Sequence, residues 1–145
     1  MDLEKALAAT PLLADLDAAI IKRLAEQGVR RVYPAGDWII RQDAPASALY
    51  IILRGRARAE KDGEMDRTPS ELYPGDFFGE LALIEDHPRT ASVLAVEETE
   101  CILFVAWEFT ALLKEHPIMA VPIMNALIKR LHRREHKPDA PAASA

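Results

Sequence analysis

The sequence predicts a mainly β domain in which antiparallel strands form a sandwich or barrel, with helices at both ends. Three observations predict this fold class. Short β-rich runs separated by turn signals follow one another from residue 31 to residue 105, with no long helix between them. Apolar residues recur at helical spacing before residue 28 and again after residue 106. The chain has 145 residues, about the length of one ordinary domain.

The N-terminal region is predicted to be helical over residues 3–27. Apolar residues recur there at helical spacing, at Leu13, Leu16, Ile20, Ile21 and Leu24. Thr10–Pro11 is typical of a helix start, because proline is favoured at the first helical position. Asp15 and Asp17 indicate a second start just beyond it, so the region forms either one helix or two.

The middle of the chain is predicted to hold the strands. The β-rich runs are Val32–Tyr33, Trp38–Ile40, Leu49–Leu53, Arg56–Glu60, Val93–Val96 and Cys101–Val105. Turn-forming residues separate them, as in the run from Pro34 to Asp37. Pro69 lies between Gly63 and Leu72 and cannot donate to a sheet ladder, so that stretch is predicted to be an edge strand or a loop.

Two more helices are predicted after the strands. The first begins near Trp107 and ends at His116–Pro117, because a residue that precedes proline disfavours the helical conformation. The last runs from Ile118 to about Lys137, with Pro122 in its first turn. Its apolar residues stand four apart, at Ile123, Leu127 and Leu131.

Composition and charge exclude several classes of protein. Half of the residues are hydrophobic and 28% are charged, which excludes a disordered chain. The formal net charge of −5 argues against a dedicated nucleic-acid binder, so no specific DNA binding is expected. Residues 129–137 hold five Lys or Arg and one Glu, which is typical of a solvated helix face. The low-complexity tail at 138–145 is predicted to be disordered, so the domain is expected to span residues 1–137.

The sequence also predicts a cytoplasmic protein without a membrane span or a metal site. Its longest apolar run, Cys101–Trp107, has seven residues, whereas a spanning helix needs ~20. The acidic N-terminus lacks the apolar core of a signal peptide. The single cysteine cannot form an internal disulfide. His132 and His136 have the i, i+4 spacing of metal ligands on a helix, but a third ligand is not evident.

One segment combines residue types that suit a phosphate ester. Gly79 lets a ligand approach the backbone closely. A short helical turn at Leu81–Leu83 would point free N–H groups at an anion. Arg89 supplies a planar fork that fits two oxygens of one phosphate, and Thr90 adds a hydroxyl. Glu80 is unsuited to a phosphate contact, so it is expected to face a neutral hydroxyl such as a ribose 2′-OH.

This combination resembles the phosphate-binding cassette of cyclic nucleotide-binding domains. Such domains occur in kinase regulatory subunits, cyclic-nucleotide-gated channels and the catabolite gene activator family. The shared pattern stands here as Phe78-Gly79-Glu80-Leu81-Ala82-Leu83 and Pro88-Arg89-Thr90-Ala91-Ser92-Val93. Upstream marks match at Pro34–Asp37, Leu49–Ile52 and Pro74–Asp76, and the glycines at family positions are Gly36, Gly55, Gly75 and Gly79. The resemblance covers roughly residues 10–135, with one departure at Gln42–Pro45, where many members carry a glycine.

The resemblance implies a fold, a ligand and a role for each site residue. The fold would be an antiparallel β-roll or jelly roll of about eight strands, with N-terminal helices and a C-terminal lid helix. The backbone donors to the ligand would be Gly79, Leu81, Ala82 and Ala91. Glu80 would bind the ribose 2′-OH, and Arg89 would bind the cyclic phosphate. Arg130 on the last helix would cover the purine, a role that Arg133 or Arg134 could take instead. Thr90 is similar to a hydroxyl residue of cGMP-selective domains, but many bacterial cAMP binders also carry Ser or Thr there, so cAMP is favoured and cGMP stays open.

The function implied is that of a regulatory sensor module, not an enzyme. Ligand binding would move the last helix, which would act on a protein partner or on a second copy of the chain. The alternative is the effector domain of a catabolite-activator-like transcription factor that lacks its helix-turn-helix part. A cupin-type metal oxygenase on a similar roll would need an H-x-H motif, which the sequence does not contain.

Overall fold

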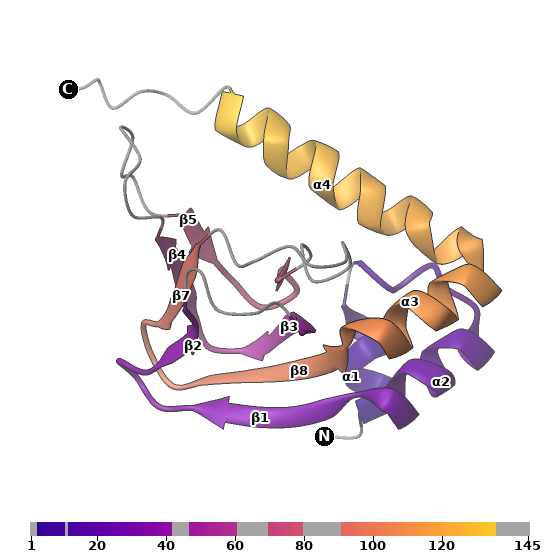
Figure 1. The fold of residues 1–145 in the computed structure, drawn as a ribbon, viewed down its shortest axis with the longest axis horizontal. Coiled ribbons are helices and arrows are strands. Elements are labelled where there is room, and N and C mark those ends of the chain that lie inside the picture. The colour runs from indigo at the N-terminus through magenta and orange to yellow at the C-terminus, as the bar shows by residue number, and fades with distance from the viewer. Residues whose placement is uncertain (1–2, 11, 42–46, 61–69, 80–90, 136–145) are drawn as a thin grey trace.

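The computed structural model describes residues 3–10, 12–41, 47–60, 70–79 and 91–135, and it shows two antiparallel sheets with helices gathered at one end (Figure 1). The first sheet has the order β1 (Val29–Tyr33), β8 (Thr99–Val105), β3 (Ala48–Arg54) and β6 (Phe77–Phe78). The second has the order β2 (Trp38–Ile40), β7 (Ser92–Ala95), β4 (Ala57–Glu60) and β5 (Ser70–Leu72). The predicted fold class, a mainly β roll of about eight strands flanked by helices, is confirmed.

The helices lie before and after the strands. They are α1 (Leu3–Ala9), α2 (Ala18–Gln27), α3 (Ala106–Glu115), the 3-10 helix η2 (Pro117–Met119) and α4 (Ala120–Glu135). Two N-terminal helices form, which was one of the two predicted alternatives, and Asp17 immediately precedes the second. The predicted helix start at Thr10 is wrong. Thr10 follows the last residue of α1, and its hydroxyl donates a 3.0 Å hydrogen bond back to the Ala6 carbonyl oxygen.

The central strands β3 and β8 are buried on both faces, which explains their uninterrupted apolar runs. Leu49 and Ile51 of β3 pack against the helices, whereas Tyr50 and Ile52 point between the two sheets. Strand β8 alternates in the same way, with Phe104 on the helix side and Cys101 between the sheets. The molecule therefore has two apolar clusters, one under the helices and one inside the roll.

Two strands test the weaker parts of the sequence prediction. Residues 70–72 form β5 at the edge of the second sheet, as predicted for the stretch that contains Pro69, which itself lies outside the described residues. Strand β6 was not predicted, because two residues are too few to show an alternating pattern. It pairs with the middle of β3, Phe78 opposite Tyr50 and Phe77 opposite Ile51.

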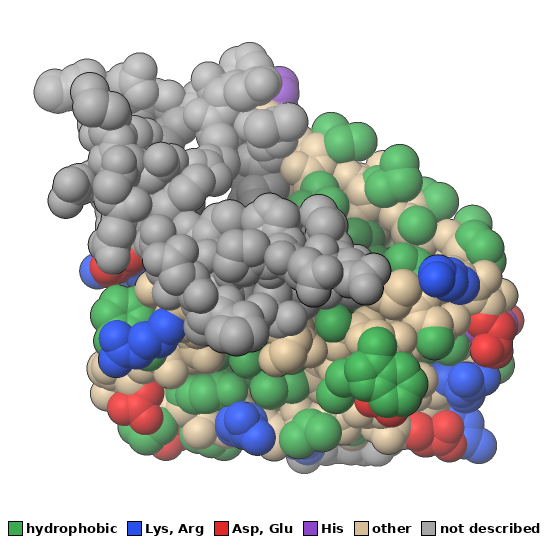
Figure 2. All heavy atoms as spheres, in the orientation of Figure 1, with side chains coloured by type: hydrophobic (Ala, Val, Ile, Leu, Met, Phe, Trp, Pro, Cys, Tyr) green, Lys and Arg blue, Asp and Glu red, His purple; other side chains and the backbone are tan. Residues whose placement is uncertain are grey.

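Helix α4 crosses above the roll (Figure 1). Ile123 is buried and Leu127 is half-buried on the face that packs against the helix-side cluster. Pro122 lies in the first turn, as predicted. Apolar side chains also gather along the outer side of the helix (Figure 2), and the exposed ones are Ile118 of η2 and Val121, Met124 and Ile128 of α4.

Candidate functional site

The structure describes the two ends of the predicted phosphate site. Gly79 and Ala91 are described, and so is the backbone of α4 at position 130. The other predicted site residues, Glu80, Leu81, Ala82, Arg89 and Thr90, lie outside the described residues. The structure therefore tests how the segment between Gly79 and Ala91 is anchored, and the roles of its residues stay predictions.

The first anchor is a turn that leads into β6 and Gly79. The Gly75 amide donates a 2.8 Å hydrogen bond to the Ile52 carbonyl oxygen, and the Ile52 amide donates to the Asp76 carbonyl oxygen at 3.0 Å. The Asp76 carboxylate accepts a 2.8 Å hydrogen bond from the Tyr73 amide. These bonds fix the turn to β3, so β6 and the residue after it are held by the central strand of the sheet.

The backbone of Gly79 has a conformation that is disfavoured for residues with a Cβ atom. Its φ is +80°, in the left-handed region where glycine has no steric penalty. The preceding Phe78 is buried and stacks on Tyr50, with ring centroids 4.9 Å apart and the planes 8° from parallel. The chain therefore leaves the sheet in a defined direction, set by a packed aromatic pair on one side and a glycine on the other.

The second anchor lies in the other sheet. Ala91 is half-buried and immediately precedes β7, which pairs with both β2 and β4. The segment from Gly79 to Ala91 thus begins at the first sheet and ends at the second. A ligand held by residues at both ends would contact both sheets.

The space between the sheets is apolar, lined by the second buried cluster, and two titratable groups border it. Burial raises the pKa of Tyr33 to about 12, and the neighbouring Tyr50 adds to the shift. Burial also raises the pKa of the Cys101 thiol to about 12, with a further contribution from the charge of Glu100. Both groups stay neutral at pH 7.

Position 130 lies on the side of α4 that faces the body of the protein. It follows Ile123 by seven residues, about two helical turns, so the helical period puts both positions on one face. Ile123 is buried against the helix-side cluster. The helix continues past this packed part to Glu135, and the covering role of Arg130 stays a prediction.

A metal site and a membrane-spanning helix were both expected to be absent. Among the described residues, no group of three or more His, Cys, Asp or Glu side chains could hold a metal ion. Within the same part of the chain, no helix combines the length and the apolar character that crossing a membrane requires.

Sequence reasoning gave no role to the residues that position the site. Tyr50, Phe78 and Asp76 set the path of the chain into Gly79. All three lie within the segments that match the family pattern, so their signal was that match and not the chemistry of their side chains.

Comparison with known proteins places a family match over the strand-rich region. Residues 30–116 match the family described as "Cyclic nucleotide-binding domain". The chain is 34% identical over 108 residues to the "Cyclic AMP receptor protein" of Thermus thermophilus, which covers 73% of this chain and 50% of that protein. It is 41% identical over 85 residues to a "cAMP-dependent protein kinase regulatory subunit" of Aspergillus fumigatus, over 59% of this chain and 20% of that one. The chain thus spans half or less of the length of these relatives.

Solved structures give a consistent result. The regulatory domain of Toxoplasma gondii PKA, crystallised with cAMP, superposes with a TM-score of 0.73 at 26% sequence identity. The match covers 86% of this chain and 48% of that one. The similarity therefore includes the helices as well as the strand region that the family match covers.

Proposed function

We propose that this chain, which belongs to the cyclic nucleotide-binding domain family, is a regulatory module that binds cAMP and couples its binding to movement of α4. The observation that carries the proposal is the anchoring of the cassette. The FGE…PRTA pattern begins at a left-handed Gly79 at the end of one sheet and ends at Ala91, the start of a strand in the other. We assign the module no catalytic residue and no metal.

The residue roles follow from the chemistry of a cyclic nucleotide. Backbone N–H groups of Gly79, Leu81, Ala82 and Ala91 would donate to the phosphate and its surroundings. Arg89 would form a bidentate charge-assisted contact with the cyclic phosphate. Glu80 would accept a hydrogen bond from the ribose 2′-OH, a neutral donor that suits a carboxylate.

Thr90 bears on the choice of nucleotide. Its hydroxyl would suit the guanine amino group of cGMP, which keeps cGMP as the alternative ligand. cAMP is favoured because the relatives described above carry cAMP in their names. Calorimetric titration of the full chain with both nucleotides decides between them: tighter binding of cGMP would overturn the choice of cAMP and leave the cassette assignment intact.

The cassette assignment is tested by Arg89→Ala. Loss of one partner of a buried charge pair typically costs about 2–5 kcal/mol of binding free energy. A ligand at 100 times its Kd stabilises the native state by about 2.7 kcal/mol, a rise in Tm of roughly 5–10 °C for a domain of this size. We expect this rise with cAMP for the natural chain and almost none for Arg89→Ala, whose own Tm stays near that of the natural protein.

The matched control is Arg23→Ala. Arg23 pairs with Glu115 on the exposed surface of α2 and α3, at 3.2 Å, and does not belong to the cassette. It should keep the full thermal shift. An Arg89→Ala chain that still shifts fully with cAMP would place the phosphate elsewhere, and one that fails to fold would make Arg89 a structural residue.

Coupling to α4 is tested by hydrogen exchange and by Arg130→Ala. With cAMP bound, exchange in residues 123–135 should slow more than exchange in residues 3–27, because of these two regions only α4 would contact the ligand. Arg130→Ala should weaken binding by about 0.5–2 kcal/mol, the range for a cation–π contact. Lys129→Ala, one position along the helix and exposed, is the matched control. Equal slowing in both regions would contradict the lid.

The output of the module is the less specific part of the proposal. The outer face of η2 and α4 exposes Ile118, Val121, Met124 and Ile128, a surface for a protein partner or for a second copy of the chain. The similarity to the Thermus thermophilus receptor protein supports a second candidate function, the effector part of a transcription factor. We place the module in the cytoplasm and, given its net charge of −5, assign it no specific DNA binding of its own.

A further inference from the structure

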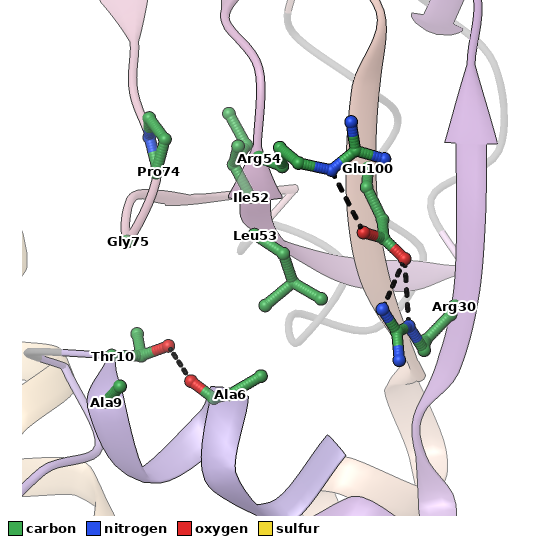
Figure 3. A pocket seen from close by; sticks show the side chains of 10 residues that line it. All are labelled: Ala6, Ala9, Thr10, Arg30, Ile52, Leu53, Arg54, Pro74, Gly75 and Glu100. Carbon is green, nitrogen blue, oxygen red and sulfur yellow. Dashed lines mark hydrogen bonds and ion pairs between the residues drawn. The ribbon is translucent and has the colours of Figure 1, made fainter. Parts of the chain in front are cut away.

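A pocket of about 380 Å³ lies between the end of α1 and the first sheet, and its lining includes none of the described cassette residues (Figure 3). One side is apolar, formed by Ala6, Ala9, Leu53 and Pro74. The opposite side is charged. Pockets of about 300–1,000 Å³ with apolar walls and a few placed polar groups are typical of small-molecule sites.

The charged side is built by the register of three strands. Glu100 of β8 lies directly opposite Arg54 of β3 and diagonally from Arg30 of β1. Arg30 binds the Glu100 carboxylate from one side. Its Nε donates a 2.9 Å hydrogen bond to Glu100 Oε2, and its Nη2 lies 2.7 Å from the same oxygen. Burial alone would raise the pKa of Glu100, but hydrogen bonds from Arg30 and Arg54 and the charges of both arginines outweigh it and lower the pKa. The carboxylate is therefore ionised and already neutralised by Arg30.

A β-bulge brings Arg54 to this position. The register shifts between Ile52, which faces Cys101, and Arg54, which faces Glu100. Without the extra residue, Leu53 would stand opposite Glu100 and Arg54 would be displaced along the strand. Bulges of this kind re-aim side chains and occur often beside binding sites.

Arg54 keeps donor capacity that its present contacts do not use. Its guanidinium lies 3.5 Å from the Glu100 carboxylate and 3.6 Å from that of Glu98. Both distances are long for a charge-assisted hydrogen bond, so both contacts are weak. The Arg54 and Glu98 side chains are 58% and 65% exposed, so water screens the attraction between them. Two guanidinium groups thus face one ionised carboxylate in the pocket lining, an excess of one positive charge.

We propose that this pocket binds a small monoanion with an apolar body, its carboxylate on Arg54 and its body against Ala9, Leu53 and Pro74. The orientation of the ligand follows from the difference between the two ends of the pocket. The α1 end presents helix carbonyl oxygens, of which that of Ala6 already accepts the Thr10 hydroxyl, so an anion gains nothing there. The arginine end attracts it.

A charge series with one shared body tests the ligand class. The probes are 4-phenylbutanoate, 4-phenylbutanol and 4-phenylbutylamine, added to the full chain and followed by NMR amide shifts. The butanoate should bind about tenfold or more tightly than the alcohol, because it adds a charge-assisted hydrogen bond. The amine should bind more weakly than the alcohol. Shifts should concentrate at residues 6–10, 53–54 and 74–75.

Matched variants test the location. Arg54→Gln should weaken binding of the butanoate about tenfold or more, whereas Arg56→Gln should not change it, since Arg56 carries similar ion pairs outside the pocket. Ala9→Leu should block the pocket, whereas Ala8→Leu, also exposed on α1 but not in the lining, should leave it open. Ala9→Leu keeps the test valid if Arg54→Gln does not fold.

The results that would overturn the pocket proposal differ from those that would overturn the cassette assignment. Equal binding of the three probes, unchanged binding in Arg54→Gln, or unchanged binding in Ala9→Leu would each refute it. Arg89→Ala should still bind the butanoate. If that variant loses the probe, the probe occupies the cassette and the pocket proposal fails while the cassette assignment stands.

Discussion

Two glycines with the same backbone conformation offer a sharp test of how the strands are connected. Gly36 has φ +90° in the turn before β2, and Gly55 has φ +99° in the connection from β3 to β4. Both conformations are disfavoured for any residue with a Cβ atom. Their surroundings differ. A Cβ atom at Gly36 would have nothing within 4 Å, whereas one at Gly55 would lie 2.4 Å from the Glu98 carbonyl oxygen and 2.6 Å from the Thr99 Cα atom.

The free energies of unfolding of the two alanine variants should therefore differ by the cost of the clash at Gly55 and of its effect on Thr99. Gly36→Ala carries only the conformational penalty, about 1–2 kcal/mol. Gly55→Ala adds overlap with backbone atoms, which cannot rotate away. It also disturbs Thr99, which is fully buried and whose hydroxyl accepts a 3.2 Å hydrogen bond from the Arg56 amide. We expect a total loss above about 4 kcal/mol, the range in which single substitutions are exceptional.

Thermal and urea unfolding of both variants measures the difference. For a domain of this size, 1 kcal/mol corresponds to about 3–4 °C in Tm. Gly36→Ala should thus lower Tm by about 3–8 °C, and Gly55→Ala should lower it by more than about 12 °C or abolish the cooperative transition. Equal losses in the two variants would refute the reasoning, because they would show that φ alone sets the effect and that the packing of β3–β4 against residues 98–99 does not matter.

Two titratable groups give further predictions. Glu100 has a pKa held below its ordinary value by Arg30 and Arg54 in spite of burial, so it stabilises the fold above its unfolded-state pKa, and this stabilisation is lost as the pH falls through the folded value. Glu100→Gln should therefore flatten the decline in unfolding free energy as the pH falls below about 5, measured in urea, because the unfolded-state pKa of a glutamate is about 4.3 and the folded value lies lower. Glu98→Gln, at an exposed carboxylate, is the control variant. Cys101 is fully buried with a pKa of about 12, so a thiol reagent at pH 8 should modify it only as fast as the protein unfolds, and rapid labelling of the native protein would contradict its placement inside the roll.

The sequence predicted those features that short segments encode by themselves. Turn signals and β-rich runs located six of the strands, and Asp17 marked the start of α2. The four glycines singled out by the family pattern all have positive φ, from +80° at Gly79 to +99° at Gly55. Such a pattern records backbone conformations that only glycine adopts readily, and the site roles of the residues between Gly79 and Ala91 stay predictions.

Other local signals were misleading or too short. Thr10–Pro11 has the composition of a helix start, but the Thr10 hydroxyl instead terminates α1 by bonding the Ala6 carbonyl oxygen. The competing preference is real, because threonine hydroxyls also bond carbonyl groups four residues back. Strand β6 has two residues, and only its pairing with β3 defines it. A local side-chain hydrogen bond decided the first case, and a tertiary contact decided the second.

The charged pocket shows why a side-chain cluster assembled across strands cannot be derived from sequence spacing. Arg30, Arg54 and Glu100 are far apart in the chain and meet because β8 pairs with β1 on one side and with β3 on the other. Since side chains alternate between the faces of a strand, a shift of one residue in either pairing would send a member to the opposite face. The bulge before Arg54 is such a shift, and it is the feature that puts this arginine opposite Glu100. No spacing rule in the sequence would have included the extra residue, so the excess positive charge beside α1 follows from strand register alone. The cassette differs in this respect, because its key residues lie within one continuous segment.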